Sequence, residues 1–144
     1  MRRWLLAGTV VVVALGAIGL GLLPTTEDGF RSTAVTSARD TRSAVLSTRE
    51  VGAAALRGRV LQSYVNIAVQ RARDQVSTAI TDLVDTEVPG PSSQRLRDEV
   101  LPMLTRSAAR INDVATASST EDRDALSRAV DELSGLAGEL GGVR

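Results

Sequence analysis

Small and apolar residues recur at alternating spacings of four and three along most of this chain, from Ala34 to Leu140, with one strong interruption. This spacing keeps the side chains on one face of an α-helix, as in helices that pack into bundles. The interruption is the segment Val88–Pro91, where two prolines flank a glycine and cannot continue a helix. The sequence therefore predicts an all-α fold.

The first helical stretch contains no proline between Asp28 and Thr86, so we predict one long helix of about 59 residues, roughly 88 Å if straight. Its first half carries a stripe of small residues: Ala34, Ala38, Thr41, Val45, Thr48, Gly52 and Ala55. Its second half carries a more apolar stripe: Leu61, Val65, Ala68, Ala72, Val76, Ala79 and Leu83. Gly52 and Gly58 are possible bend points, because glycine weakens a helix interior.

Two shorter helices are predicted after the proline-rich break. One begins at a cap on Ser92 or Ser93 and contains Pro102, where we expect a kink or a late start. The other follows the capping box Ser118-x-x-Glu121 and ends at the glycine pair 141–142. Their apolar seams are Leu101, Leu104, Ala108, Ile111 and Ala115, then Leu126, Val130, Leu133, Ala137 and Leu140.

The predicted architecture is a three-helix bundle of residues 53–144 on a helical stalk of residues 25–52. Short connections force antiparallel neighbours, so the outer half of the long helix packs with the two shorter ones. The small-residue stripe of the stalk then has no partner in its own chain, and we expect it to pair with a second copy or to form a solvated single helix. The alternative is a four-helix bundle with a sharp turn near Gly52, which is disfavoured because that turn lacks proline, asparagine or an Asp-Gly pair.

The N-terminal segment 1–24 carries an uncharged run, Trp4–Leu23, directly after Arg2 and Arg3. Twenty helical residues span roughly 30 Å, the hydrocarbon thickness of a bilayer. The run is longer than the apolar region of a signal peptide and lacks an A-x-A cleavage site, so we predict an uncleaved membrane anchor. The alternatives are a cleaved secretory signal or a twin-arginine export signal. The basic residues before the run place residues 25–144 outside the cytoplasm.

Composition excludes several classes of function. The 17 arginines balance the 17 acidic residues, and the absence of clustered positive charge argues against nucleic-acid binding. The chain has no histidine, cysteine or lysine to activate a nucleophile. Acidic residues that flank the Pro-Gly-Pro break (Asp82, Asp85 and Glu87 before it, Asp98 and Glu99 after it) form no calcium-loop motif. We therefore assign no catalytic, cofactor-binding or metal-ligating residues and expect no cofactor.

The predicted architecture, one membrane helix before an extracytoplasmic helical bundle, is similar to the periplasmic sensing bundles of bacterial receptors, although no motif is shared. The leading hypothesis is a non-enzymatic, membrane-anchored module for protein–protein interaction or scaffolding at the bacterial cell envelope. Three alternatives remain: a small-ligand-binding sensor bundle, a secreted helical protein, or a stalk that reaches into the cytoplasm. The partner is an unidentified envelope protein, a second copy, or both.

Overall fold

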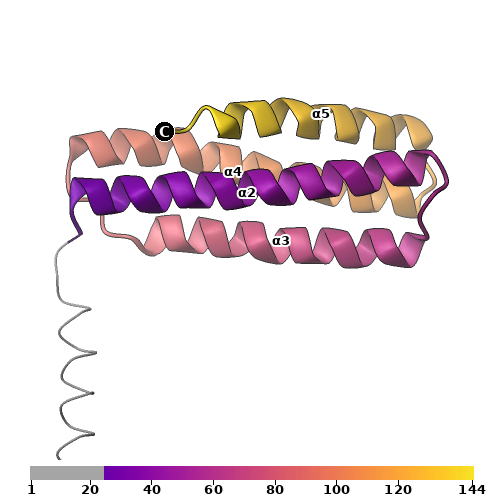
Figure 1. The fold of residues 1–144 in the computed structure, drawn as a ribbon, viewed down its shortest axis with the longest axis horizontal. Coiled ribbons are helices and arrows are strands. Elements are labelled where there is room, and N and C mark those ends of the chain that lie inside the picture. Colours follow the sequence, from indigo (N-terminus) through magenta and orange to yellow (C-terminus); the bar gives the residue numbers. More distant parts are fainter. Residues whose placement is uncertain (1–24) are drawn as a thin grey trace, which may run out of the picture.

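The computed structural model describes residues 25–144, which form four α-helices joined by short turns (Figure 1). They are α2 (Glu27–Leu56), α3 (Gln62–Asp85), α4 (Pro91–Ser119) and α5 (Arg123–Gly141). Consecutive helices run in opposite directions. The α3–α4 turn and the start of α2 lie at one end of the bundle, which we call the proximal end. The α2–α3 and α4–α5 turns lie at the other, the distal end.

The predicted anchor, residues 4–23, lies outside the described residues. None of the four described helices combines the length and the hydropathy that a bilayer crossing requires.

The prediction of one long helix with a membrane-proximal stalk is wrong, and the four-helix alternative is confirmed. The chain leaves the helix after Leu56 and starts the next helix at Gln62. The break occurs at Gly58, whose φ of +66° is a backbone conformation that glycine adopts without steric cost. Gly52, the position considered for a turn, instead stays helical inside α2.

Residues 25–52 therefore belong to the bundle and not to a separate stalk. Six of the seven positions of the small-residue stripe are buried, from Ala34 to Gly52, and only Ala55 is half-buried. The helices α3, α4 and α5 all contact α2 and cover it. The stripe thus has its partner within its own chain, which removes the reason to expect that it pairs with a second copy.

Small side chains also explain the cross-section of the bundle. The backbones of the diagonal pair α2 and α4 approach each other closely, whereas those of the other diagonal pair, α3 and α5, do not. Alanine, threonine, serine and glycine at the buried positions of α2 keep its interior face shallow. Buried Ser107 does the same on α4. Helix axes approach more closely where the side chains between them are small, so the bundle is compressed along the α2–α4 diagonal.

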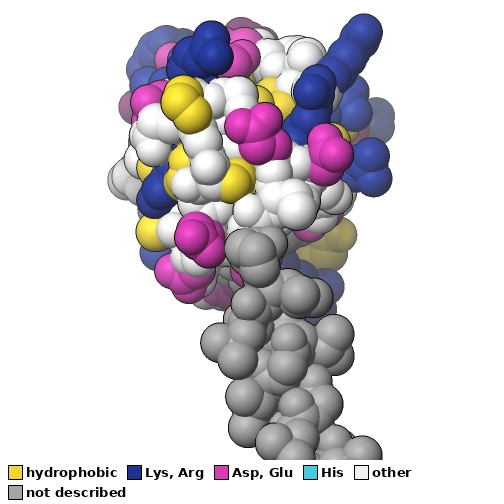
Figure 2. All heavy atoms as spheres, turned by 90° about the vertical axis from the view of Figure 1, so that its left-hand side faces the viewer, with side chains coloured by type: hydrophobic (Ala, Val, Ile, Leu, Met, Phe, Trp, Pro, Cys, Tyr) yellow, Lys and Arg dark blue, Asp and Glu magenta, His cyan; other side chains and the backbone are white. Residues whose placement is uncertain are grey.

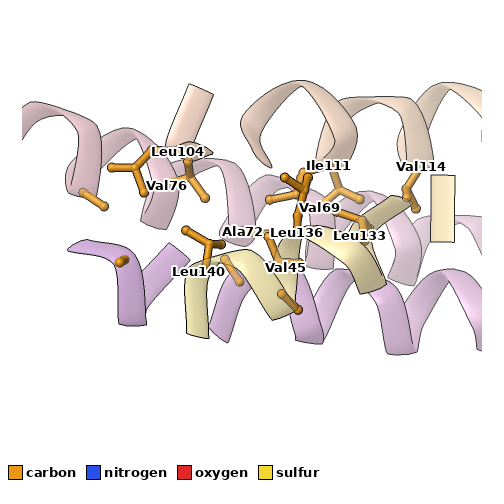
Figure 3. Packing of buried hydrophobic residues seen from close by; sticks show 14 of the residues in the cluster. Val45, Val69, Ala72, Val76, Leu104, Ile111, Val114, Leu133, Leu136 and Leu140 are labelled. Carbon is orange, nitrogen blue, oxygen red and sulfur yellow. The ribbon is translucent and has the colours of Figure 1, made fainter. Parts of the chain in front are cut away.

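The core is a single aliphatic cluster to which all four helices contribute (Figure 3). Val45 of α2, Val76 of α3, Leu104 and Ile111 of α4, and Leu133 of α5 are all fully buried. These residues lie at the predicted seam positions, so the helical spacing identified most of the core correctly. Phe30, the single phenylalanine of the chain, is also fully buried, near the proximal end of α2.

Different groups cap the starts of the first and third of these helices. Thr26 caps α2, because its hydroxyl accepts a hydrogen bond from the Gly29 amide at 3.1 Å. The helix α4 begins with Gly90 as N-cap and Pro91 as its first residue, with no side-chain cap from Ser92 or Ser93. Proline is favoured at this position because its φ is fixed in the helical range and the missing N–H has no partner there anyway.

The predicted capping box at residues 118–121 does not form. Ser118 still belongs to α4, and its hydroxyl donates to the amide oxygen of Gln62 at 2.5 Å. Asp122 caps α5 instead, and its carboxylate accepts from the Ala125 amide at 2.9 Å. The expected late start at Pro102 does not occur either, because α4 continues through this exposed residue.

One buried hydroxyl in the core lacks a hydrogen-bond partner among residues 25–144. The Oγ1 atom of fully buried Thr41 makes no hydrogen bond, whereas the Thr48 hydroxyl donates to the Ala44 carbonyl at 2.9 Å. A buried polar group without a partner costs about 1–3 kcal/mol of desolvation.

We therefore expect Thr41→Val, which replaces this hydroxyl by a methyl group of the same shape, to raise the free energy of unfolding by about 1 kcal/mol. The matched variant Thr48→Val removes a satisfied hydrogen bond and should not stabilise. Urea denaturation monitored by circular dichroism measures both. Equal effects of the two substitutions would contradict the assignment of Thr41 as an unsatisfied group.

Candidate functional site

The turn between α2 and α3 forms one half of the distal end. The Gly58 amide donates to the Ala55 carbonyl at 2.9 Å, and the Arg59 amide donates to the Ala54 carbonyl at 2.9 Å. The second hydrogen bond encloses the first, and Gly58 is in the left-handed conformation. This arrangement defines a Schellman C-cap. The cap satisfies carbonyls that the end of α2 would otherwise leave free, and it directs Val60 and Leu61 across the end of the bundle.

The turn between α4 and α5 repeats this geometry with a different residue. The Glu121 amide donates to the Ser118 carbonyl at 3.4 Å, and the Asp122 amide donates to the Ala117 carbonyl at 3.0 Å. Glu121 takes the left-handed position with φ of +57°. A non-glycine side chain costs roughly 1 kcal/mol in this conformation, so the fold stores strain at the distal end.

We expect Glu121→Gly to raise the free energy of unfolding by about 0.5–1 kcal/mol, because it relieves this strain. The reciprocal substitution Gly58→Ala introduces the same strain at the other turn. A built Cβ there meets no atom within 4 Å, so its cost of about 1 kcal/mol is purely conformational. Thermal and urea unfolding of both variants measure the two changes in the free energy of unfolding. Changes of the same sign would show that the two turns do not share this geometry.

A hollow of about 280 Å³ opens between the two distal turns. Val65, Ala117 and Leu126 lie at its floor and are at most 5% exposed. Its other lining residues are Ala55, Leu56, Val60, Gln62, Ser118, Glu121, Asp122 and Arg123. The floor is therefore apolar, and the strained Glu121 stands at its rim.

Three large hydrophobic side chains are exposed at the start of α3, the end of that helix from which Gln62 and Val65 line the hollow. Leu61, predicted as a core position, is 78% exposed because it is the residue that precedes α3. Tyr64 and Ile67, on the first two turns of α3, are 55% and 54% exposed. Among residues 25–144, the other large exposed hydrophobic side chain is Val84, at the opposite end of the same helix. Clustered exposure of this kind marks contact surfaces, whereas scattered exposure does not.

The charges of the distal end are separated between its two turns. Arg57 and Arg59 are exposed on the α2–α3 turn. Glu121 and Asp124 are exposed on and beside the α4–α5 turn. Arg123 also lies on the α4–α5 turn, but its positively charged guanidinium reaches across to the end of α2, where it donates to the Leu56 carbonyl. The distal end thus has a basic side and an acidic side.

At the proximal end, among the residues that the structure describes, the one large exposed hydrophobic side chain is Val84. A hollow of about 400 Å³ there is lined by acidic and basic side chains together, and Figure 2 shows both signs of charge on this face. Several of these groups already have partners. The Glu27 carboxylate accepts from the Ser92 hydroxyl at 2.7 Å, and the Arg31 guanidinium donates to the Arg144 carbonyl at 3.0 Å. We interpret these contacts as polar interactions that hold the helix ends together.

Two of the three acidic residues before the Pro-Gly-Pro break lie beside α2. Asp82 and Asp85 line a groove of about 460 Å³ together with Asp40 and the hydroxyl residues Ser32, Thr33, Thr36, Ser37 and Thr86. Glu87, Asp98 and Glu99 do not line it. Within residues 25–144, no three acidic side chains gather closely enough to hold a metal ion.

Ion pairs on the side of the bundle have a structural role. The Arg110 guanidinium contacts the carboxylates of Asp113 and Glu132 at 2.7 Å each. The hydrogen bond to Asp113 and the charge of Glu132 raise the pKa of Arg110. A second pair, Arg106 with Glu139 at 2.6 Å, joins the same two helices. These pairs are exposed to solvent, which screens them, so they contribute little to stability.

Comparison with known proteins finds no matching family model, no matching curated protein and no matching solved structure. The function is therefore inferred from the geometry and chemistry of the chain itself.

Proposed function

We propose that this chain is a non-catalytic docking module, held in the membrane by residues 4–23, whose distal end binds a protein partner outside the cytoplasm. The observation that carries the proposal is the exposure of Leu61, Tyr64 and Ile67, three residues apart at the start of α3, at the same end of the bundle as the apolar hollow. A protein contact has an apolar centre and a polar rim. The arginines and carboxylates of the two distal turns provide such a rim.

The position of the cluster along the bundle supports the same proposal. The helix α2 has 30 residues and runs the length of the bundle, which corresponds to about 45 Å. The start of α2, which follows the predicted anchor region in the sequence, lies at the proximal end. A membrane-anchored copy would therefore hold its exposed hydrophobic residues at the point farthest from its anchor, where a partner can reach them.

Site-specific photocrosslinking in the native host cell tests the docking surface. A photoreactive phenylalanine analogue replaces Tyr64 in one variant and Val84 in the control, which is an exposed position on the same helix at the opposite end. We expect a crosslinked product of higher mass for position 64 and none for position 84. Equal crosslinking at both positions would show that the distal end is not a specific contact surface.

The cellular location of the protein is tested separately. Mass spectrometry of membrane and culture-medium fractions should find the intact chain, including residues 1–24, in the membrane. Protease added to spheroplasts should then digest residues 25–144. Recovery from the medium of a chain shortened by its first two dozen residues would contradict the membrane anchor but would leave the docking surface untouched.

A small-ligand sensor is the rival function. Its only support at the distal end is the hollow of about 280 Å³, which lies below the range of roughly 300–1,000 Å³ usual for small-molecule sites. A metabolite panel that raises the melting temperature of the wild-type protein, but not of Leu126→Ala, would favour the sensor over the docking module.

A further inference from the structure

We propose that the distal end docks onto the distal end of a second copy of this chain. This inference rests on the proposed function, because it names the partner of the same surface. Two copies related by a twofold axis across the distal end would contact through their α2–α3 and α4–α5 turns. Their proximal ends would then point away from each other.

The shape of the distal end is self-complementary. Leu61 projects from the α2–α3 turn and is 78% exposed. Its two neighbours in sequence, Val60 and Gln62, line the hollow, so the projecting side chain stands beside an apolar depression on the same surface. In a twofold pair, the same patch meets itself. Leu61 of each copy can therefore enter the hollow of the other, where Val65 and Leu126 form an apolar floor.

The charges favour the same partner. The basic residues Arg57 and Arg59 lie on one turn, and the acidic residues Glu121 and Asp124 lie on and beside the other. A twofold axis that passes between the turns places the basic turn of each copy over the acidic turn of its partner. A uniformly acidic or basic partner would be attracted by one turn and repelled by the other, whereas a second copy complements both.

The size of the surface predicts a weak contact. The surface consists of two helix turns and the first turns of α3, and small interfaces of this kind are typical of weak, transient contacts. We therefore expect a dissociation constant in the micromolar range or weaker. In the pair, two bundles of about 45 Å lie end to end, so residues 25 of the two copies are roughly 90 Å apart. Membrane-anchored copies would thus pair between two facing membranes.

Charge reversal tests the pairing, with two variants of the full chain in detergent. The acidic variant carries Arg57→Glu and Arg59→Glu, and the basic variant carries Glu121→Arg and Asp124→Arg. All four positions are exposed, so unchanged circular dichroism and melting curves are expected. Each variant alone should self-associate at least about tenfold more weakly than wild type, because like charges then face each other across the pair.

Mixing the two variants is the decisive step. The mixture should recover association to the wild-type level, because each copy now presents the charge that the other lacks. Contacts within one chain or between the apolar N-terminal segments cannot produce this recovery, since neither depends on which two variants meet. Sedimentation velocity with one variant fluorescently labelled measures the association of the two variants. Failure of the mixture to associate more strongly than either variant alone would overturn the proposal.

Cysteine crosslinking tests the geometry, because the chain contains no cysteine of its own. A mixture of the single variants Arg59→Cys and Glu121→Cys should form a disulfide-linked pair under mild oxidation. Ser32→Cys, near the proximal end, should not form one. Pairs through Ser32→Cys would indicate parallel packing and would overturn the end-to-end arrangement. If both tests fail while position 64 still crosslinks to another protein in cells, the second copy is excluded and the docking module stands.

Discussion

Phe30→Ala is expected to lower the free energy of unfolding by about 3–5 kcal/mol, the usual cost of removing a large aromatic side chain from a core. Phe30 is fully buried although it lies only three residues after the start of α2. It is the bulkiest buried side chain of the described bundle, and its neighbours on α2 are too small to close the cavity. The melting temperature should fall by roughly 10–20 °C, because a domain of this size loses a few degrees per kcal/mol.

The control for this prediction is Leu61→Ala, which truncates an apolar side chain that is 78% exposed. It should change the free energy of unfolding by no more than about 0.5 kcal/mol, as surface substitutions do. The comparison also separates the two architectures that the sequence allowed. On a free stalk Phe30 would be solvent-exposed, and its truncation would be nearly neutral. A loss below about 1 kcal/mol would therefore support the stalk and contradict the four-helix bundle.

The sequence predicted the helical class and most of the core because helical spacing depends only on which residues are apolar. Leu104, Ile111, Leu133 and Leu140 were assigned to seams and are buried. The number of helices was not predicted, because Gly52 and Gly58 look alike in sequence. Glycine weakens a helix interior by about 1 kcal/mol, and it is equally suited to a left-handed C-cap. Local preference therefore does not say which of the two glycines ends the helix.

One signal in the sequence does mark the break. The stripe of the first half ends at Ala55 and that of the second half begins at Leu61, a spacing of six that fits neither three nor four. A continuous helix would place Gly58 or Arg59 at the intervening seam position, and neither residue contributes to a core. A break in the apolar spacing that coincides with a glycine therefore indicates a turn. It does so more strongly than the absence of proline or asparagine indicates a continuous helix.

The distal surface was harder to predict because its residues match the sequence patterns of a core seam and of a capping box. Leu61 continues a seam of apolar residues, yet it is exposed because it precedes the first turn of α3. Glu121 appeared to complete a capping box, yet it takes the left-handed position of a C-cap. Both errors arise at helix ends, where a shift of one residue changes which side chain faces the core. The arrangement of the hollow, the two turns and the separated charges follows only from tertiary packing.

Gly52 is expected to be the position in α2 that tolerates an added side chain least. A Cβ built at this buried glycine lies 2.8 Å from the Cγ2 atom of Val130 and 3.5 Å from the Cγ1 atom of Val114. Valine in a helix has one strongly preferred rotamer, so Val130 cannot easily turn away. Alanine gains about 1 kcal/mol of helix propensity here, but overpacking costs about 1–3 kcal/mol. We expect Gly52→Ala to be destabilising, and Gly52→Leu to cost at least about 3 kcal/mol.

Two other glycines make this prediction sharp, because they offer the same substitution without the contact. Gly135 and Gly138 lie within α5, are exposed, and would meet no atom within 4 Å of an added Cβ. Gly135→Ala and Gly138→Ala should each stabilise by about 0.5–1 kcal/mol through helix propensity alone.

The double variant Gly52→Ala/Val130→Ala should be more stable than the sum of its single changes by about 1 kcal/mol or more, because the neighbour that causes the clash is gone. Chemical denaturation of these variants provides the test. If Gly52→Ala stabilised the protein as much as Gly135→Ala, the close approach of α2 to α5 at this position would be absent, and with it the packing that makes residues 27–56 part of the bundle.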